Sequence, residues 1–137
     1  MDTAIASRGC PATLHIPLPS AALAARHARR TVALLLAQEA AGVCRPDVAE
    51  DLVLIVSELV TNAVLHADGP YALTVSLEQG RAGVAVSDGS TDLYGRHGGR
   101  QRTEPGGRGL EIVRALGAEL FVSPSGRGKQ VIAVLTW

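Results

Sequence analysis

The sequence predicts an α+β fold, a two-layer α/β sandwich in which helices cover one face of a mostly antiparallel, mixed sheet. Two long helical patterns stand in the first half of the chain, and short segments that alternate apolar and polar residues follow them. The alternating segments come in pairs around turn signals, which is typical of hairpins. The expected order is therefore strand, helix, helix, two strands, a loop, a helix and two strands.

One strand and two helices are expected in the first half of the chain. Residues 1–12 form a flexible lead-in, and residues 13–18 alternate apolar and polar side chains as a strand does. Ser20 suits the N-cap of an alanine- and leucine-rich helix that ends near Gly42. A second helix, which begins with an aspartate, is expected over residues 47–67.

Two hairpins and a lid are expected in the second half. Residues 71–77 and 83–86 alternate and are joined by a turn around Gln79-Gly80. Residues 89–107 are rich in glycine and arginine without apolar periodicity, and a loop of this length is typically a functional lid or disordered. A short helix and two closing strands are expected over residues 109–116, 119–123 and 130–136.

The bulk composition suits a single domain over residues 13–137 and narrows the class of function. Hydrophobic residues make up 47% of the chain and charged residues 19%, as in ordinary globular proteins. The formal net charge is zero, which argues against a general binder of nucleic acid or anionic membranes. The two cysteines lack metal-ligand spacing, and no secretory signal or membrane-spanning run is recognisable. These observations predict a cytoplasmic protein with reduced thiols.

The most informative motif is a polar stripe on the second expected helix. Glu58, Asn62 and His66 follow one another at four-residue steps, so a helix places all three on one face. Most positions around them are apolar, which predicts burial, and a buried carboxylate and amide are costly unless something satisfies them. The asparagine carbonyl is a ligand that Mg²⁺ accepts, and the carboxylate can act as a general base. The structural alternative is an asparagine that caps a neighbouring loop and a glutamate paired with an arginine.

Two further segments suit a nucleotide. Asp88 follows a strand, where a carboxylate can accept a hydrogen bond from an exocyclic amine such as that of adenine. Its structural alternative is an ordinary Asp-Gly turn. Residues 104–110 place glycines directly before a helix, where backbone N–H groups and the helix dipole can hold phosphate. The alternative there is a flexible glycine loop with solvated arginines. Gly128-Lys129-Gln130 has only a superficial similarity to a Walker motif.

Taken together and in this order, these motifs resemble the GHKL family of ATP-binding domains, and most closely the small bacterial anti-sigma-factor serine/threonine kinases. The stretch from Glu58 to His66 matches the N box of that family, and Val86-Ser-Asp88-Gly-Ser matches its G1 box. Gly107-Arg-Gly109-Leu-Glu-Ile-Val matches the G2 box, and Gly128-Lys129-Gln130 stands where the last box belongs. The resemblance covers nearly the whole chain, from about Leu14 to Trp137.

The resemblance implies a role for each matching residue. Asn62 would coordinate a Mg²⁺ that bridges the ATP phosphates, and Glu58 would be the catalytic general base. Asp88 would read the adenine amino group, while Gly107 and Gly109 would let backbone amides approach the phosphates and would hinge the lid. The remaining nucleotide-binding positions that the resemblance implies are Arg108, Leu110 and Gln130.

Two positions depart from the family pattern. Gln130 stands where the family commonly has a threonine that helps to hold adenine, and Ser90 stands where the wider superfamily prefers glycine. The first departure bears on the hydrogen bonds around adenine, and the second bears on the mobility of the loop. Neither removes the metal or the base position.

The resemblance implies an anti-sigma factor that phosphorylates a serine of a STAS-type anti-anti-sigma protein, sequesters a sigma factor and so regulates transcription. ATP and Mg²⁺ are the implied cofactors, a homodimer is implied, and no direct contact with nucleic acid or membrane is expected. A basic face on the first helix is a candidate contact for an acidic partner, although such faces are most often solvated; it consists of Arg26, His27, Arg29 and Arg30. Two alternatives remain: a non-catalytic ATP-sensing module that binds partners, and the detached ATP-binding domain of a histidine kinase.

Overall fold

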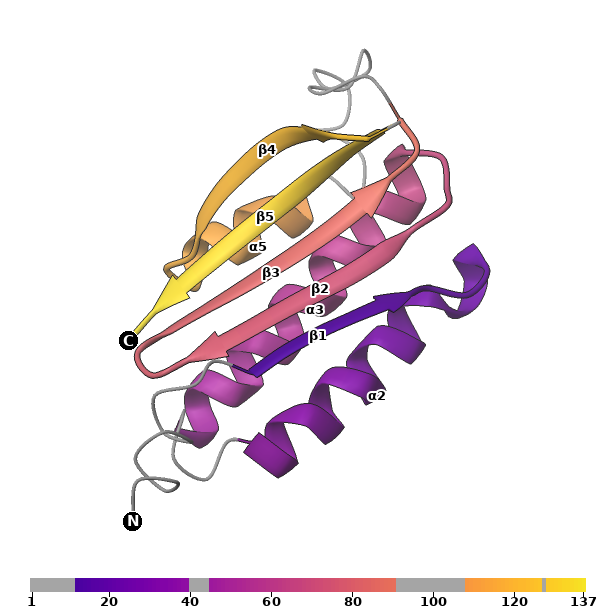
Figure 1. Ribbon diagram of the computed structural model, residues 1–137. Coiled ribbons are helices and arrows are strands. Elements are labelled where there is room, and N and C mark those ends of the chain that lie inside the picture. The colour runs from indigo at the N-terminus through magenta and orange to yellow at the C-terminus, as the bar shows by residue number, and fades with distance from the viewer. Residues whose placement is uncertain (1–11, 40–44, 91–107, 127) are drawn as a thin grey trace.

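A computed structural model describes residues 12–39, 45–90, 108–126 and 128–137 (Figure 1). The strands are β1 (Ala12–Pro17), β2 (Ala72–Glu78), β3 (Arg81–Asp88), β4 (Glu119–Ser125) and β5 (Gly128–Thr136). The helices in these ranges are α2 (Ala21–Glu39), α3 (Pro46–His66) and α5 (Arg108–Ala115). The strands form one sheet in the order β1-β2-β3-β5-β4, and each of its four pairings is antiparallel.

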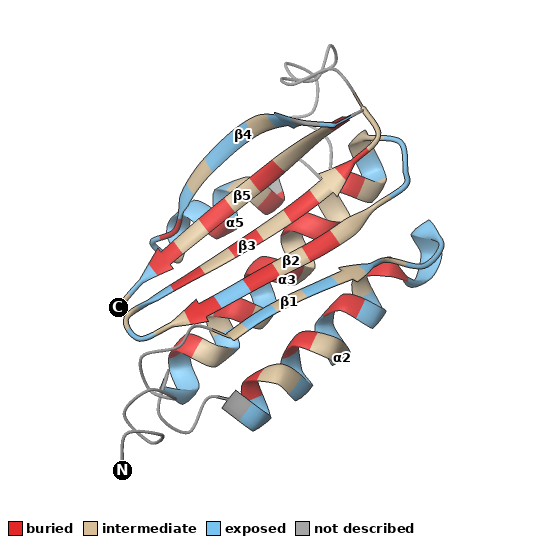
Figure 2. Cartoon of the chain, in the orientation of Figure 1, coloured by how far each residue is buried: buried red, intermediate tan, exposed pale blue. Residues whose placement is uncertain are grey.

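The molecule has two layers. α3 and α5 lie behind the sheet in Figure 1, and α2 packs beside α3 on the side of β1. Every second residue of β3 from Ala82 to Asp88 is buried, and the buried positions of the sheet join those of the helices in one core (Figure 2). This alternation is expected for a strand with one covered face. The predicted α+β fold with helices on one face is confirmed.

α3 provides the centre of the core. Leu52, Ile55 and Leu59 are among the largest fully buried side chains, and each burial stabilises the fold by about 1.5–3 kcal/mol. Leu54 and Leu65 on the same helix are exposed, so α3 is buried on part of its circumference rather than all round. In the described ranges, neither α3 nor any other helix is long and apolar enough to cross a membrane.

The start of α3 differs from the sequence prediction. Arg45 is the N-cap residue and Pro46 begins the helix, one residue before the predicted start. Proline is favourable there because the N–H that it lacks would have no partner within the helix. Asp47 therefore lies in the first turn, and its carboxylate is 3.3 Å from Nε of Arg45.

β3 and β5 are longer than predicted, and the added residues lie at the candidate site. β3 continues past Val86 to Asp88, and β5 begins at Gly128 instead of residue 130. The backbone ladder pairs Asp88 with Lys129 and continues although the apolar alternation has stopped. Polar residues at a strand end hide the true length of the strand from a pattern-based prediction.

The predicted lead-in lies outside the described residues except for Ala12, which begins β1. The predicted lid likewise lies outside them, except for Gly89 and Ser90. The predicted hairpin turn at Gln79-Gly80 is present, and Gly80 has a φ of +85°. Gly80 is the second central residue of this turn, where a positive φ favours glycine because glycine adopts left-handed backbone without steric cost.

Candidate functional site

The polar stripe lies on the last two turns of α3. Glu58, Asn62 and His66 are all half-buried, whereas Leu59 and Ala63 between them are buried. The four-residue spacing therefore aligns the three polar side chains at the border of the core. At this border an amide and a carboxylate can stay in contact with water, and they can also contact a ligand.

The stripe meets the start of α5 at Glu58. A Cβ added to Gly109 would lie 3.0 Å from Oε1 of Glu58 and 3.6 Å from the backbone oxygen of the same residue. Any side chain at position 109 would therefore press on this carboxylate, and glycine lets the first turn of α5 approach it. The N box and the G2 box, about fifty residues apart in the sequence, meet at this contact.

Asp88 is a buried carboxylate with two contacts from the protein. Its Oδ1 accepts a 2.8 Å hydrogen bond from the backbone N–H of Ser90, which is the local pattern of an Asx turn. Its Oδ2 lies 2.9 Å from Nζ of Lys129 in an ion pair. The Asp88 side chain is 1% exposed and the Lys129 side chain is 12% exposed. Asp88 thus takes part in the Asp-Gly turn that was the structural alternative, and it is also a buried charged group.

The register of the sheet decides which residue of the last box faces Asp88. Lys129 is directly opposite Asp88, and Gln130 is opposite Ser87. Paired residues of an antiparallel ladder project to the same face, so Lys129 shares the helix-covered face with Asp88. Gln130 projects to the other face. The structure brings Lys129 to this carboxylate and does not bring Gln130 there.

Sequence reasoning did not assign Lys129 to the site. The available signal was the strand register counted from the Gly126 turn, because Ser125 pairs with Gly128 and the next residue of β5 falls opposite Asp88. The missed residue is also the single lysine of the chain.

Close backbone packing holds the end of β3 in place. A Cβ on Gly128 would overlap the carbonyl oxygen of Asp88, and a Cβ on Gly89 would overlap the carbonyl oxygen of Gly69. The N–H of Gly89 also donates a 2.6 Å hydrogen bond to the carbonyl of Asp68. Three backbone segments therefore meet at the end of β3 around Asp88.

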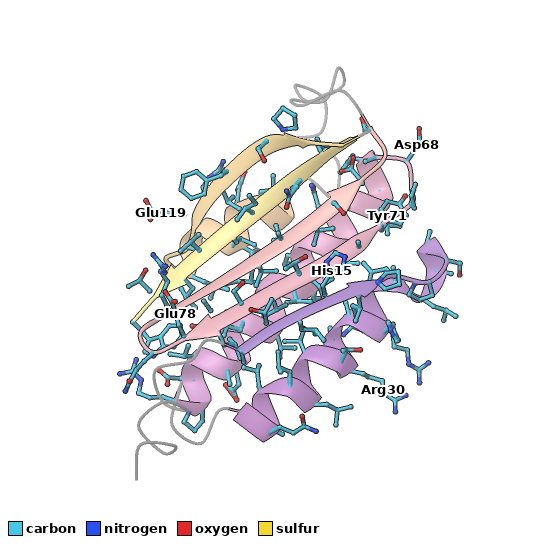
Figure 3. All side chains as sticks on the ribbon, in the orientation of Figure 1. His15, Arg30, Asp68, Tyr71, Glu78 and Glu119 are labelled. Carbon is cyan, nitrogen blue, oxygen red and sulfur yellow. The ribbon has the colours of Figure 1, made fainter. Side chains whose placement is uncertain are left out.

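Tyr71 lies beside this junction, and both Asp68 and Tyr71 are found at the end of the sheet where β3 ends (Figure 3). Its hydroxyl donates a 2.6 Å hydrogen bond to the carbonyl of Ala67 at the end of α3. Burial raises the pKa of Tyr71, and the negative charges of Asp68 and Asp88 raise it further. The phenol therefore stays protonated and ties the α3 end to the sheet.

Three further nucleotide-binding positions were predicted around the start of α5. Gly107 lies outside the described residues, Arg108 is the first residue of α5, and Leu110 is half-buried against the core. His15, on β1, is bonded through Nδ1 to the Thr74 hydroxyl at 2.7 Å and belongs to the sheet away from the stripe.

The described residues fit a Mg²⁺–nucleotide pair at the stripe. No group of three His, Cys, Asp or Glu able to hold a metal occurs within the described ranges. Mg²⁺ commonly takes one or two protein oxygens and completes its shell with water and phosphate oxygens. Asn62 offers such an oxygen from a half-buried position on α3, one turn after Glu58. This donor set suits a magnesium ion carried by phosphates rather than a protein-only metal site.

Comparison with known proteins identifies the class of this chain. A family model described as histidine kinase-like ATPase domain matches residues 19–135. The chain belongs to this family of GHKL-type ATP-binding domains. No curated protein matches the sequence significantly.

Among solved structures, the chain is similar to the histidine kinase domain from Erythrobacter litoralis EL346 blue-light activated histidine kinase. The two share 29% sequence identity with a TM-score of 0.45, over 64% of this chain and 44% of the other. This chain thus corresponds to less than half of the length of that relative.

Proposed function

We propose that this ATP-binding domain is an anti-sigma factor that acts as a Mg²⁺-dependent protein serine kinase. In this proposal it transfers the γ-phosphoryl group of ATP to a serine of a STAS-type anti-anti-sigma protein, and it sequesters a sigma factor. The observation that carries the proposal is the contact of Glu58 with Gly109. In this contact the carboxylate of Glu58 lies next to the start of α5, the helix that follows the glycine-rich segment.

The reacting groups of the proposed transfer are the serine hydroxyl, the γ-phosphoryl group of ATP and the carboxylate of Glu58. The serine oxygen forms a bond to the γ-phosphorus, the bond to the β,γ-bridging oxygen breaks, and ADP leaves. The serine proton goes to the carboxylate of Glu58, which acts as the general base. Mg²⁺, held by Asn62 and the phosphates, supplies neutralising charge when bound. Phosphoryl transfer depends chiefly on such positioning and charge stabilisation, so few protein groups suffice.

Asp88 is the proposed acceptor for the adenine amino group. Its carboxylate is buried and fixed by the Ser90 N–H, which supports a role in reading a base rather than in binding solvent cations. An acceptor in a buried site discriminates strongly, because it is left unpaired when a wrong base enters.

The α2 helix supports a docking surface for an acidic partner. Arg26 and Arg30 are exposed, whereas Arg29 is tethered through a 3.1 Å hydrogen bond to the hydroxyl of Ser57 on α3. Two exposed guanidinium groups on one helix face can steer a negatively charged protein toward the domain. The proposed assembly is a homodimer that binds protein partners and neither nucleic acid nor membrane.

A transfer assay tests the proposal against its two alternatives. The protein is incubated with ATP radiolabelled at the γ-phosphate, Mg²⁺ and candidate anti-anti-sigma proteins. Acid-stable phosphoserine on the partner supports the kinase, and acid-labile phosphohistidine indicates a detached histidine kinase domain. Nucleotide binding and partner capture without any transfer indicate the ATP-sensing module and overturn the proposed enzyme.

A further inference from the structure

We propose that Lys129 competes with the nucleotide base for the carboxylate of Asp88, so that adenine reaches this carboxylate only after the ion pair opens. Lys129 thereby sets the affinity of the domain for ATP. The inference rests on the proposed function, because it takes Asp88 as the acceptor for the adenine amino group. It adds a regulation of that same site, in which an ammonium group of the protein occupies the acceptor that the base needs.

The strand geometry builds the ion pair. The β3–β5 register sets Lys129 directly opposite Asp88, on the face of the sheet that the helices cover. A Cβ on Gly128 would overlap the carbonyl oxygen of Asp88, so glycine lets the start of β5 lie against the end of β3. Nζ of Lys129 and Oδ2 of Asp88 are 2.9 Å apart. The backbone by itself therefore brings the ammonium to the carboxylate.

Both oxygens of Asp88 are engaged in this arrangement. Oδ1 accepts the N–H of Ser90 at 2.8 Å, and Oδ2 accepts from the ammonium of Lys129. Only 1% of the Asp88 side chain is exposed, against 12% of the Lys129 side chain. An incoming amino group therefore has to displace one of the two donors. The ammonium is the movable one, because it ends a flexible four-carbon stem, whereas the N–H of Ser90 belongs to the backbone turn.

The exchange of the ammonium for adenine is unfavourable on the protein side. The contact between ammonium and carboxylate carries charge on both partners, whereas the amino group of adenine is a neutral donor and forms a weaker bond. The low exposure of the pair strengthens the attraction between its charges. The adenine contact therefore offsets only part of the cost of opening the pair. Because the base contact forms only in molecules with an open pair, the apparent dissociation constant for ATP rises as that fraction falls.

Calorimetric titration with Mg·ATP measures the competition. Lys129→Met removes the ammonium and keeps an apolar stem, and its dissociation constant for ATP should be roughly 10- to 100-fold lower than that of the wild-type protein. Lys129→Gln leaves a neutral donor for Asp88, which spares the fold an unpaired buried carboxylate, and should lower the constant by a smaller factor. Lys129→Arg retains a competing cation and should bind ATP more weakly than either neutral variant.

The sign of the change separates competition from ordinary attraction between charges. A cation that only attracts the phosphates would weaken ATP binding when it is removed. Arg81→Met is the matched control, because Arg81 pairs with Glu78 at 2.6 Å at the far end of β3, where both side chains are well exposed. This control should not tighten ATP binding.

A nucleotide without the exocyclic amino group isolates the contact with Asp88. Purine riboside triphosphate differs from ATP in lacking this group. For the wild-type protein, the dissociation constants of the two nucleotides should agree within about threefold, because loss of the ion pair offsets the adenine contact. For Lys129→Met, ATP should bind about tenfold more tightly than the analogue, because nothing competes for the carboxylate.

Lys129 is the single lysine, so its amine can be followed in the wild-type protein. Acetylation of this amine, measured by peptide mass spectrometry, should become faster when Mg·ATP is added, because the displaced ammonium becomes accessible. A lysine that binds the nucleotide would be protected instead. Mg·tripolyphosphate carries no base and should leave the acetylation rate unchanged.

The outcomes distinguish this inference from the proposed function. ATP that protects Lys129 from acetylation overturns the inference and leaves the proposed function intact. The same holds for ATP affinity that is unchanged or weaker in Lys129→Met and Lys129→Gln. If Lys129→Met does not fold, Lys129→Gln and the acetylation of the wild-type protein decide. Absence of ATP binding by the wild-type protein and by every variant overturns both.

Discussion

Glu58 on α3 and Gly109 at the start of α5 are in contact, with only 3.0 Å between Oε1 and the position that a Cβ of residue 109 would take. A side chain at position 109 would crowd the carboxylate of another helix, whereas the backbone dihedral of Gly109 itself is not one that favours glycine. This contact links the proposed base to the segment that follows the glycine-rich loop. A side chain introduced at position 109 would shift the carboxylate of Glu58 without removing it.

Gly109→Ala should preserve the fold but slow phosphoryl transfer. The new methyl group would displace Glu58 by a few tenths of an ångström, and a misplaced catalytic group costs about tenfold or more in rate. Alanine has a higher helix propensity than glycine, by about 1 kcal/mol, which offsets part of the crowding. Circular dichroism melting and single-turnover transfer separate the two effects. A wild-type transfer rate in this variant would contradict the importance of the contact.

Glu58→Gln should leave ATP bound and reduce transfer about 10²- to 10⁴-fold, because the amide cannot take the serine proton. The measurement is the single-turnover rate at saturating Mg·ATP. Glu50→Gln changes an exposed glutamate of the same helix and serves as the control, with no expected change. If Glu58→Gln transfers phosphate as fast as the wild-type protein, Glu58 is a structural carboxylate.

Asn62→Ala should remove the magnesium dependence of nucleotide affinity while the fold survives. The variant loses the single amide oxygen proposed for the ion, whereas Asn62→Asp keeps an oxygen ligand and should keep the dependence. Titrations with ATP in the presence and absence of Mg²⁺ measure the difference. Unaltered Mg·ATP binding by Asn62→Ala would rule out the metal assignment.

Gly128→Ala should destabilise the protein by about 1–3 kcal/mol or more, because its Cβ would overlap the backbone of Asp88 and β5 would have to move. Gly83→Ala is the matched control, since a Cβ at that position of β3 has no heavy atom within 4 Å. The control should be neutral or slightly stabilising. Denaturant unfolding of both variants gives the comparison, and equal stabilities would argue against the close approach of the strands.

Arg26→Glu combined with Arg30→Glu should weaken capture of an acidic partner and leave nucleotide affinity unchanged. Both arginines are exposed on α2, so reversing their charge alters the surface and not the core. Pull-down at low and moderate salt measures the effect, with Arg114→Glu on α5 as an exposed control. Capture that is equal in both variants would exclude this face as the docking surface.

Local patterns were sufficient for most of the fold. The apolar periodicity predicted α2 and α3, the alternation predicted β1 and β2, and the turn signal predicted the hairpin at Gly80. These features repeat over a few residues, so the sequence contains them directly. Strand ends were predicted less well, because at the site β3 finishes and β5 begins with polar or glycine residues.

The sequence by itself determined that Glu58, Asn62 and His66 share one face of a helix, because a four-residue spacing is a local property of helical geometry. Only the tertiary structure decided that Glu58 touches Gly109 and that Lys129, not Gln130, faces Asp88. Both relationships join segments distant along the chain. A shift of one residue in strand register would move every side chain to the opposite face, and no local pattern settles that choice.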